Sequence, residues 1–281
     1  MKIIFLSLLA LGVCLSFSLN AQSQEKQINP DGITFTILYN DVPLNDSFVG
    51  DQGFSCFIEI DDRSFLFDAG RIEEVMAKNT EASGIDCFGT EFIFISHLHS
   101  DHTGGLPGFV EQSGRPLLFL PASTPKSQSP KGREYVVSKL EKALPHISDT
   151  VHIREPARLN EYMYSTGMFE DRTYEQSLII NTTKGLIILT GCSHPGIVEI
   201  VRGAKSQMNS DIYFVMGGFH LVTTDPEQVK TIAGELRGLT KYIAPGHCTG
   251  EKAQEIFKDV FKDDYIEIKT GFTFKLSGEN E

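Results

Sequence analysis

The chain has 281 residues, of which 41% are hydrophobic and 22% are charged, so it contains enough apolar sequence for a sizeable core and could form one or two domains. Its formal net charge of −12 disfavours nucleic acid as a partner, because that affinity comes mainly from the neutralisation of phosphates by Lys and Arg. A small anionic substrate is not excluded, because a bound divalent cation would reverse the local field.

The first 21 residues have the pattern of a secretory signal peptide. Lys2 provides a positive start, residues 3–19 are mostly apolar, and Ala21 precedes a cleavage point before Gln22. The alternative is a retained N-terminal anchor, although the apolar run is of marginal length for a membrane span. We therefore expect a secreted or periplasmic protein whose mature chain has no integral membrane span, with residues 22–32 as a flexible lead-in.

Strand-like and helix-like segments alternate from Ile33 onward. Short apolar runs predict strands, a longer segment that ends near a glycine predicts a helix, and Asp61–Arg63 predicts a tight turn between two strands. In chain order, we expect strands at 33–38, 54–60 and 64–67, a helix at 72–82, a strand at 91–95, a helix near 105–111 and a strand at 116–120.

Residues 121–176 interrupt this alternation. Residues 121–130 are rich in Pro and Ser and predict a surface loop, which is followed by a helix at 132–144. Short strands are expected at 151–153, 159–161 and 163–165. We interpret the region as an elaboration that lies over the functional site, and the alternative is a peripheral extension without contact to substrate.

The second half resumes the pattern without a tandem sequence repeat. We expect strands at 178–181 and 186–190, a helix at 195–204, a strand at 212–216, a helix at 226–236, a strand at 242–244, a helix at 251–261 and strands at 266–268 and 272–274. Composition and periodicity together indicate an α/β protein with both element types throughout the chain.

The motif His97-Leu98-His99-Ser100-Asp101-His102 places four possible metal ligands within six residues. It follows the predicted strand at 91–95 and precedes Gly104 and Gly105, so its ligands lie on a loop at the end of a strand, as suits a rigid metal site. Neutral imidazole together with carboxylate favours zinc, manganese or iron. The alternative is a polar loop of solvated histidines.

This motif, placed after a strand, resembles the signature of the metallo-β-lactamase superfamily. The resemblance implies a four-layer αβ/βα sandwich in a single domain over residues 33–281, with the site at the sheet edges. Asp68, at the end of a predicted strand, matches an earlier Asp of the superfamily that orients the site through hydrogen bonds. The resemblance also implies further ligands from loops in the second half of the chain.

Three histidines of the second half each lie close to glycines after a predicted strand, namely His194, His220 and His247. A lone histidine in such a place is more often structural, but the first-half motif requires partner ligands, which favours His194 and His247. The motifs around the three histidines together resemble the branch of dihydropterin-ribofuranosylaminobenzene phosphate synthase-like metallo-hydrolases.

Two positions depart from the wider superfamily. Tyr174–Ser177 stands where many members have a Gly-His-Thr-Pro-Gly motif, and Cys192 stands where many have a metal-bridging Asp. His194 is then the expected replacement for the missing histidine. Cys192 is either a soft ligand or, as we favour, a structural or supporting residue, and Glu175 or Gln176 could approach the site from the start of its strand.

The resemblance therefore implies two divalent metal ions, with zinc as the first choice and manganese or iron as alternatives. His97, His99 and His194 would hold one ion, and Asp101, His102 and His247 would hold the other. Metal-bound hydroxide would attack a small anionic substrate, a phosphoester in the first place. The catalytic residues would be Asp101 and His220, and His220 would protonate a leaving group or hold an anionic oxygen. The alternatives are a synthase-type transferase and a metal-binding module without turnover.

Overall fold

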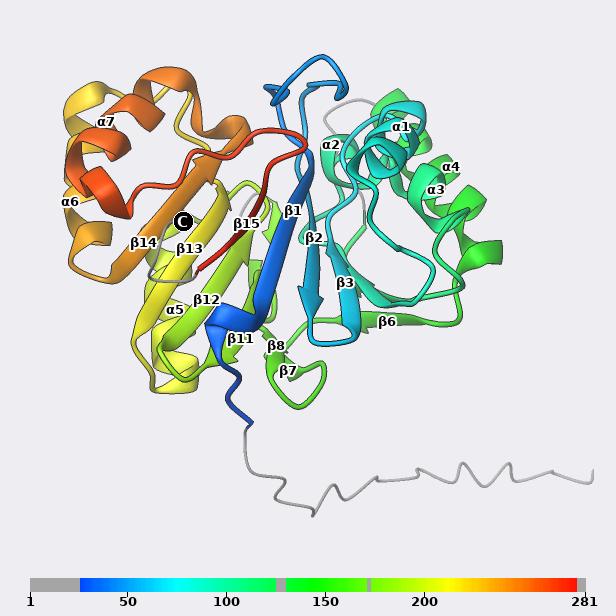
Figure 1. Ribbon diagram of the computed structural model, residues 1–281, viewed down its shortest axis with the longest axis horizontal. Coiled ribbons are helices and arrows are strands. Elements are labelled where there is room, and N and C mark those ends of the chain that lie inside the picture. The colour runs from blue at the N-terminus through cyan, green and yellow to red at the C-terminus, as the bar shows by residue number, and fades with distance from the viewer. Residues whose placement is uncertain (1–25, 125–129, 171–172, 277–281) are drawn as a thin grey trace, which may run out of the picture.

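The computed structural model describes residues 26–124, 130–170 and 173–276, which form two large β-sheets with helices on their outer faces (Figure 1). The expected signal peptide at 1–21 and residues 22–25 lie outside the described residues. Across the described ranges, no helix is long and apolar enough to cross a membrane.

The first sheet has seven strands in the order β15-β1-β2-β3-β4-β5-β6. Their bounds are Ile33–Tyr39 for β1, Ser55–Ile60 for β2, Arg63–Phe67 for β3, Thr90–Phe94 for β4, Leu117–Pro121 for β5, Thr150–Ile153 for β6 and Thr273–Lys275 for β15. Strands β3 to β6 are parallel to one another. The helices beside this sheet are α1 (Glu73–Ser83), α2 (Ser100–Thr103), α3 (Leu106–Val110) and α4 (Pro130–Ala143) (Figure 1).

The second sheet has six strands in the order β14-β13-β12-β11-β8-β7. Their bounds are Ala157–Arg158 for β7, Met163–Ser165 for β8, Leu178–Thr182 for β11, Gly185–Thr190 for β12, Ile212–Gly218 for β13 and Thr240–Gly246 for β14. Strands β12, β13 and β14 are parallel. The helices α5 (Ile197–Met208), α6 (Pro226–Arg237) and α7 (Glu251–Phe261) cover this sheet, and β9 (Phe169–Glu170) and β10 (Tyr174–Glu175) form a separate ribbon.

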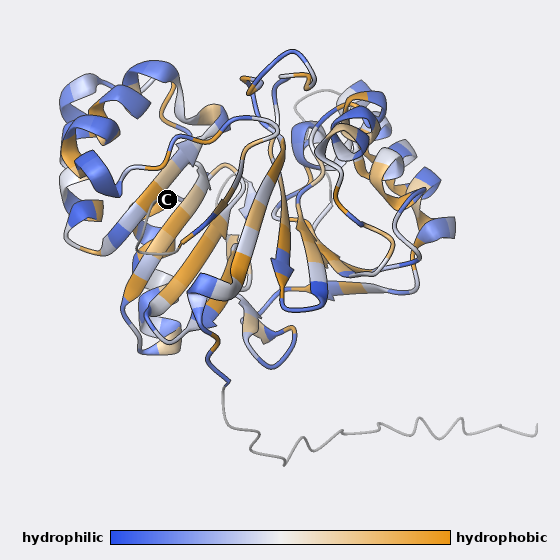
Figure 2. Cartoon of the chain, viewed as in Figure 1, coloured by the Kyte–Doolittle hydropathy of each residue, from blue (hydrophilic) through white to orange (hydrophobic). Residues whose placement is uncertain are grey.

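Alternation along the strands builds three apolar layers, because successive side chains of a strand point to opposite faces. In β12, Ile187 and Leu189 enter the cluster between the two sheets, whereas Leu186 and Ile188 enter the cluster beneath α5, α6 and α7. A third cluster fills the space between the first sheet and its helices. Figure 2 shows the result, with apolar residues along the strands and polar residues on the outer sides of the helices. The expected four-layer αβ/βα sandwich is confirmed.

Segments of the region 121–176 form part of the two sheets. Strand β6 extends the first sheet beyond β5, and β8 pairs with β11 of the second sheet, so the segment supplies edge strands to both sheets. The strand expected at 159–161 lies instead at Ala157–Arg158, and β9 and β10 were not predicted.

Two terminal expectations also differ from the structure. Ile28, in the predicted flexible lead-in, is buried and forms a bridge with Thr182 of β11. The strand expected at 266–268 is irregular, with a single bridge between Tyr265 and Ile243 of β14. Both segments therefore lie along the second sheet without forming regular strands of it.

Candidate metal centre

The candidate ligands lie on loops that follow parallel strands of both sheets. The motif at 97–102 follows β4, His194 follows β12, His220 follows β13 and His247 follows β14. Because the carboxyl ends of parallel strands meet at one edge of a sheet, these loops share the same end of the sandwich. The structure brings all six predicted metal ligands, and His220, to this end.

The first predicted group, His97, His99 and His194, is tightly assembled. Nε2 of His97 lies 3.1 Å from Nδ1 of His99. The centroid of the His194 ring lies 4.8 Å from that of His97 and 5.0 Å from that of His99. Burial, reinforced by neighbouring histidines, lowers the pKa of His97 well below its usual value and that of His99 to about 4. Both imidazoles are therefore neutral near pH 7, which is the form that binds a metal.

The second group contains Asp101, His102 and His247, and also Cys192. One ligand atom from each of these four residues lies within 4.8 Å of the others. Nε2 of His247 is buried, lies 3.4 Å from Oδ2 of Asp101 and has no hydrogen-bond partner among the described residues. Buried polar atoms are nearly always satisfied, so an unpartnered nitrogen aimed at three other ligand atoms fits a metal ion.

Cys192 is common to both groups. Its Sγ lies 3.3 Å from Nε2 of His102, and it also lies within 4.8 Å of ligand atoms of His97 and His194. Its buried thiol therefore stands between the two sets of ligands, at the position where many superfamily members carry a bridging Asp. This placement supports the soft-ligand alternative over the structural role that the sequence favoured.

Asp68 supports the second group as expected. It is fully buried, and its carboxylate accepts hydrogen bonds of 2.7 Å from the backbone N–H and the hydroxyl of Ser96. The same carboxylate lies 2.7 Å from Nδ1 of His102. This contact holds the proton on Nδ1 and leaves Nε2 of His102 to face Cys192 and the other ligands.

Glu175 orients a histidine of the first group, as Asp68 does in the second group, and the sequence did not predict this role. Its buried carboxylate lies 2.7 Å from Nδ1 of His194 and accepts hydrogen bonds from the backbone N–H groups of Cys192, Ser193 and His194. Burial raises the pKa of Glu175, but the hydrogen bond and charge of His194 outweigh it and lower the pKa to about 2. Glu175 therefore orients a ligand loop rather than binding metal itself.

Gln176 connects the two halves of the site. Its Nε2 donates to the carbonyl of Ile95, just before the first-half motif, and its Oε1 accepts from the hydroxyl of Ser165. Both polar ends of the amide are thus committed to protein partners. Gln176 therefore connects the segment after β4 of the first sheet to β8 of the second sheet, and it is not a metal ligand.

His220 lies at the open side of the centre. It has a positive φ of 52°, is exposed, and its ring lies 4.7 Å from the ring of His194. Together with Cys192 and Cys248 it forms a third close group of ligand atoms. A hydrogen bond with Cys248 raises the pKa of His220, so this thiol, which the sequence did not single out, is part of its surroundings.

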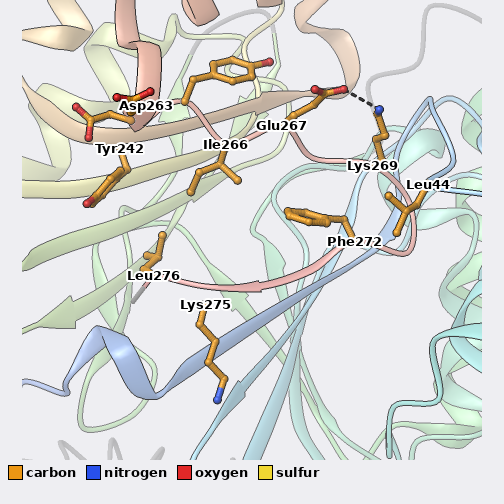
Figure 3. A pocket seen from close by; sticks show the side chains of 11 residues that line it. Leu44, Tyr242, Asp263, Ile266, Glu267, Lys269, Phe272, Lys275 and Leu276 are labelled. Carbon is orange, nitrogen blue, oxygen red and sulfur yellow. Dashed lines mark ion pairs between the residues drawn. The ribbon is translucent and has the colours of Figure 1, made fainter. Parts of the chain in front are cut away.

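A cavity of about 590 Å³ lies elsewhere, between β14 and the segment that leads to β15 (Figure 3). Tyr242, Ile266 and Phe272 give it apolar walls, and Lys269 and Glu267 form an ion pair of 2.8 Å at its edge. None of the candidate metal ligands lines this cavity. Its size alone does not connect it to the chemistry of the metal centre.

The two-sheet sandwich and its His/Asp/Cys cluster define a metalloprotein of the metallo-β-lactamase fold, and comparisons with known proteins agree. Residues 49–118 match the family model of the metallo-beta-lactamase superfamily. A protein of Methanocaldococcus jannaschii, named 7,8-dihydropterin-6-methyl-4-(beta-D-ribofuranosyl)-aminobenzene-5'-phosphate synthase, is 30% identical in an alignment that covers 86% of this chain and 96% of the relative. The chain belongs to the metallo-β-lactamase superfamily.

Solved structures support the same assignment. Tm1679, described as a metal-dependent hydrolase of the beta-lactamase superfamily, is 25% identical with a TM-score of 0.70, and the match covers 87% of this chain and 99% of that one. The short form of human tRNase Z is 13% identical with a TM-score of 0.55, and the match covers 86% of this chain and 98% of that one. The second similarity concerns the fold alone.

Proposed function

We propose that the chain is a metal-dependent hydrolase of a small anionic substrate, in the first place a phosphoester, and that it holds two divalent ions. The observation that carries this proposal is the convergence of two ligand groups on Cys192. His97, His99 and His194 would hold one ion, and Asp101, His102 and His247 would hold the other. Divalent ions at these positions would lower the pKa of bound water and polarise a substrate oxygen.

The residues in and around the ligand groups would have different roles in the reaction. Asp68 and Glu175 fix the orientation of His102 and His194, so that each presents Nε2 to the centre. In the metal-free chain, burial raises the pKa of Asp101, but its interactions with His102 and His247 outweigh burial and lower that pKa, so the carboxylate is ionised near neutral pH and available to a divalent ion. His220, on the open side, would give a proton to the leaving group or hold an anionic oxygen.

The proposal is tested by removing and restoring the metal. Elemental analysis of the purified protein should find close to two equivalents of a divalent metal. Chelation should abolish the hydrolysis of phosphomonoesters, phosphodiesters or lactones in a substrate panel, and added Zn²⁺ or Mn²⁺ should restore it. Full activity of the metal-free protein would overturn the proposal, and tight metal binding without any turnover would favour a binding module.

A synthase-type transferase is the second candidate, because the archaeal relative that bears such a name matches this chain over 96% of its own length. The sequence of residues 1–21 weighs against it, because we propose that this segment exports the protein, whereas the metabolites of such a synthase are cytosolic. Cell fractionation tests the secreted or periplasmic location. Recovery of the full-length chain in the cytosol would remove this objection to the transferase.

A further inference from the structure

A cavity of about 210 Å³ adjoins the open side of the metal centre. It lies between the start of α5, the loop after β13 and helix α6. The residues that line it include His194, Ile197, Val198, Phe219, His220 and Ile232. The cavity is therefore apolar over most of its wall and is bordered by two histidines of the candidate site.

The deeper wall of the cavity is rigid. Phe219 is 1% exposed, its ring packs at 5.5 Å against the ring of Phe257, and its backbone N–H donates to the hydroxyl of Thr249. Ile197 is 2% exposed and belongs to the cluster beneath α5, α6 and α7. A wall held by packing and hydrogen bonds keeps its shape, which is what a specific binding site requires.

The entrance is formed by side chains that are only partly buried. Val198 on α5 and Ile232 on α6 both pack against the same cluster while retaining exposed surface. Gly196, which precedes α5 and has a φ of 101°, leaves open space on its side of the cavity, because a Cβ there would meet no atom closer than 4.0 Å. Apolar surface thus remains accessible next to the metal ligands.

The neighbouring histidines connect this cavity to the reaction. Glu175 holds the ring of His194 through a contact of 2.7 Å, and His220 faces that ring at 4.7 Å. A substrate whose anionic ester lies among the metal ligands and His220 therefore has its adjoining substituent beside Val198 and Ile232. Glu199 at the rim is exposed and forms an ion pair of 3.5 Å with Arg202.

We propose that this cavity is an apolar subsite that selects esters carrying one compact apolar group, a single aromatic ring or an alkyl chain of similar volume. Cavities of about 150 Å³ lined by Leu, Ile and Phe accept benzene, so 210 Å³ holds one ring but not two fused rings. Each methylene buried there strengthens binding by roughly fourfold. This inference rests on the proposed hydrolase function and names its substrate class.

The first test compares methyl, butyl, phenyl and naphthyl phosphates as substrates of the metal-loaded protein. We expect kcat/KM to rise at least tenfold from methyl to phenyl phosphate and to fall again for naphthyl phosphate. Val198→Phe should fill the cavity and lower the phenyl-to-methyl ratio at least tenfold, whereas Val198→Ala should shift the optimum towards naphthyl phosphate. Val151→Phe, a change of the same size at an exposed position on β6, should leave the ratio unchanged.

A second measurement separates the subsite from the proposed function. Calorimetry with phenylphosphonate and methylphosphonate, which are not hydrolysed, measures the same preference as a ratio of dissociation constants. If no ester is hydrolysed but phenylphosphonate binds at least tenfold more tightly and loses this advantage in Val198→Phe, the subsite stands and the hydrolase function fails. Hydrolysis or binding that does not depend on substituent size, or on Val198, overturns the subsite.

Discussion

Glu175→Gln is the substitution that best tests how this metal centre is organised. Oε1 of Glu175 accepts from the backbone N–H groups of Cys192 at 2.9 Å and Ser193 at 2.8 Å. Oε2 accepts from the backbone N–H of His194 at 2.9 Å and lies 2.7 Å from its Nδ1. Gln has the same shape, but its amide nitrogen is a donor, so either orientation sets it against two of these four donors.

The expected loss of stability follows from this count. A buried donor left without a partner costs about 1–3 kcal/mol, so two such donors cost roughly 2–6 kcal/mol. We expect the free energy of unfolding of the metal-free protein to fall by about 3–5 kcal/mol. Loss of a hydrogen-bonded support behind a metal ligand also lowers metal affinity by about 10–100-fold.

The pH dependence gives an independent check. The pKa of Glu175 is lowered from 4.5 to about 2 in the folded chain, and this difference corresponds to about 3 kcal/mol. A folded-state pKa below the unfolded value means that this stabilisation is complete above pH 4.5 and is lost as pH falls towards 2. The Gln variant lacks this titration, so its unfolding free energy should depend less steeply on pH in that window.

The assay is denaturant unfolding of metal-free protein between pH 2 and 7, together with a zinc competition titration at neutral pH. Glu255→Gln, an exposed carboxylate on α7, is the matched control and should change neither quantity. If Glu175→Gln unfolds and binds zinc like the unmodified protein, the carboxylate does not organise the loop at 192–194.

Three further predictions concern side chains of the candidate metal centre. His194→Ala should lose about one metal equivalent in elemental analysis and most activity, and retention of both would move the ligand elsewhere. His220→Ala should keep its metal but lower turnover about 10²–10⁴-fold, whereas metal loss would make His220 a ligand. Cys192→Ser preserves the volume but removes the soft donor, so stepwise competition titrations should show weaker binding of both ions. Unchanged affinities would return Cys192 to a structural role.

The long strands could be predicted because their patterns are strong. Most residues of β1, β3 and β12 are buried, so each segment is rich in apolar or β-branched residues and lies between turn signals. Their predicted and observed bounds differ by at most one residue at either end. The turn at Asp61 and Asp62 could also be predicted, because Asp is among the residues that tight hairpin turns prefer.

The two-residue strands β7, β9 and β10 could not be predicted in the same way. β7, β9 and β10 have two residues each, which is too short for any periodicity to show. They are strands because of their partners, since β7 pairs with β8 and β9 pairs with β10. Such pairing depends on contacts made after the sheets have assembled.

The residues of the candidate site also differ in whether a local sequence pattern predicts them. The motif at 97–102 was evident because its ligands are contiguous, and Asp68 because it follows a recognisable strand. Glu175 lies in one of the short strands and contacts partners 17–19 residues later in the chain, so neither its burial nor its acceptor role had a local signal. The sequence indicated that Glu175 could lie near the site, but only the structure shows which groups its carboxylate contacts.

Cys192 shows how one substitution in a shared scaffold can alter metal preference. A carboxylate between two metal positions is a hard donor that suits manganese, whereas a thiolate is a soft donor that suits zinc more than manganese. Because Cys192 is shared by both ligand groups, a change of donor there would act on both of the proposed metal positions. Asp101 and the surrounding imidazoles alone would accept several metals, so the sulfur of Cys192 is the atom in this cluster that most strongly favours zinc.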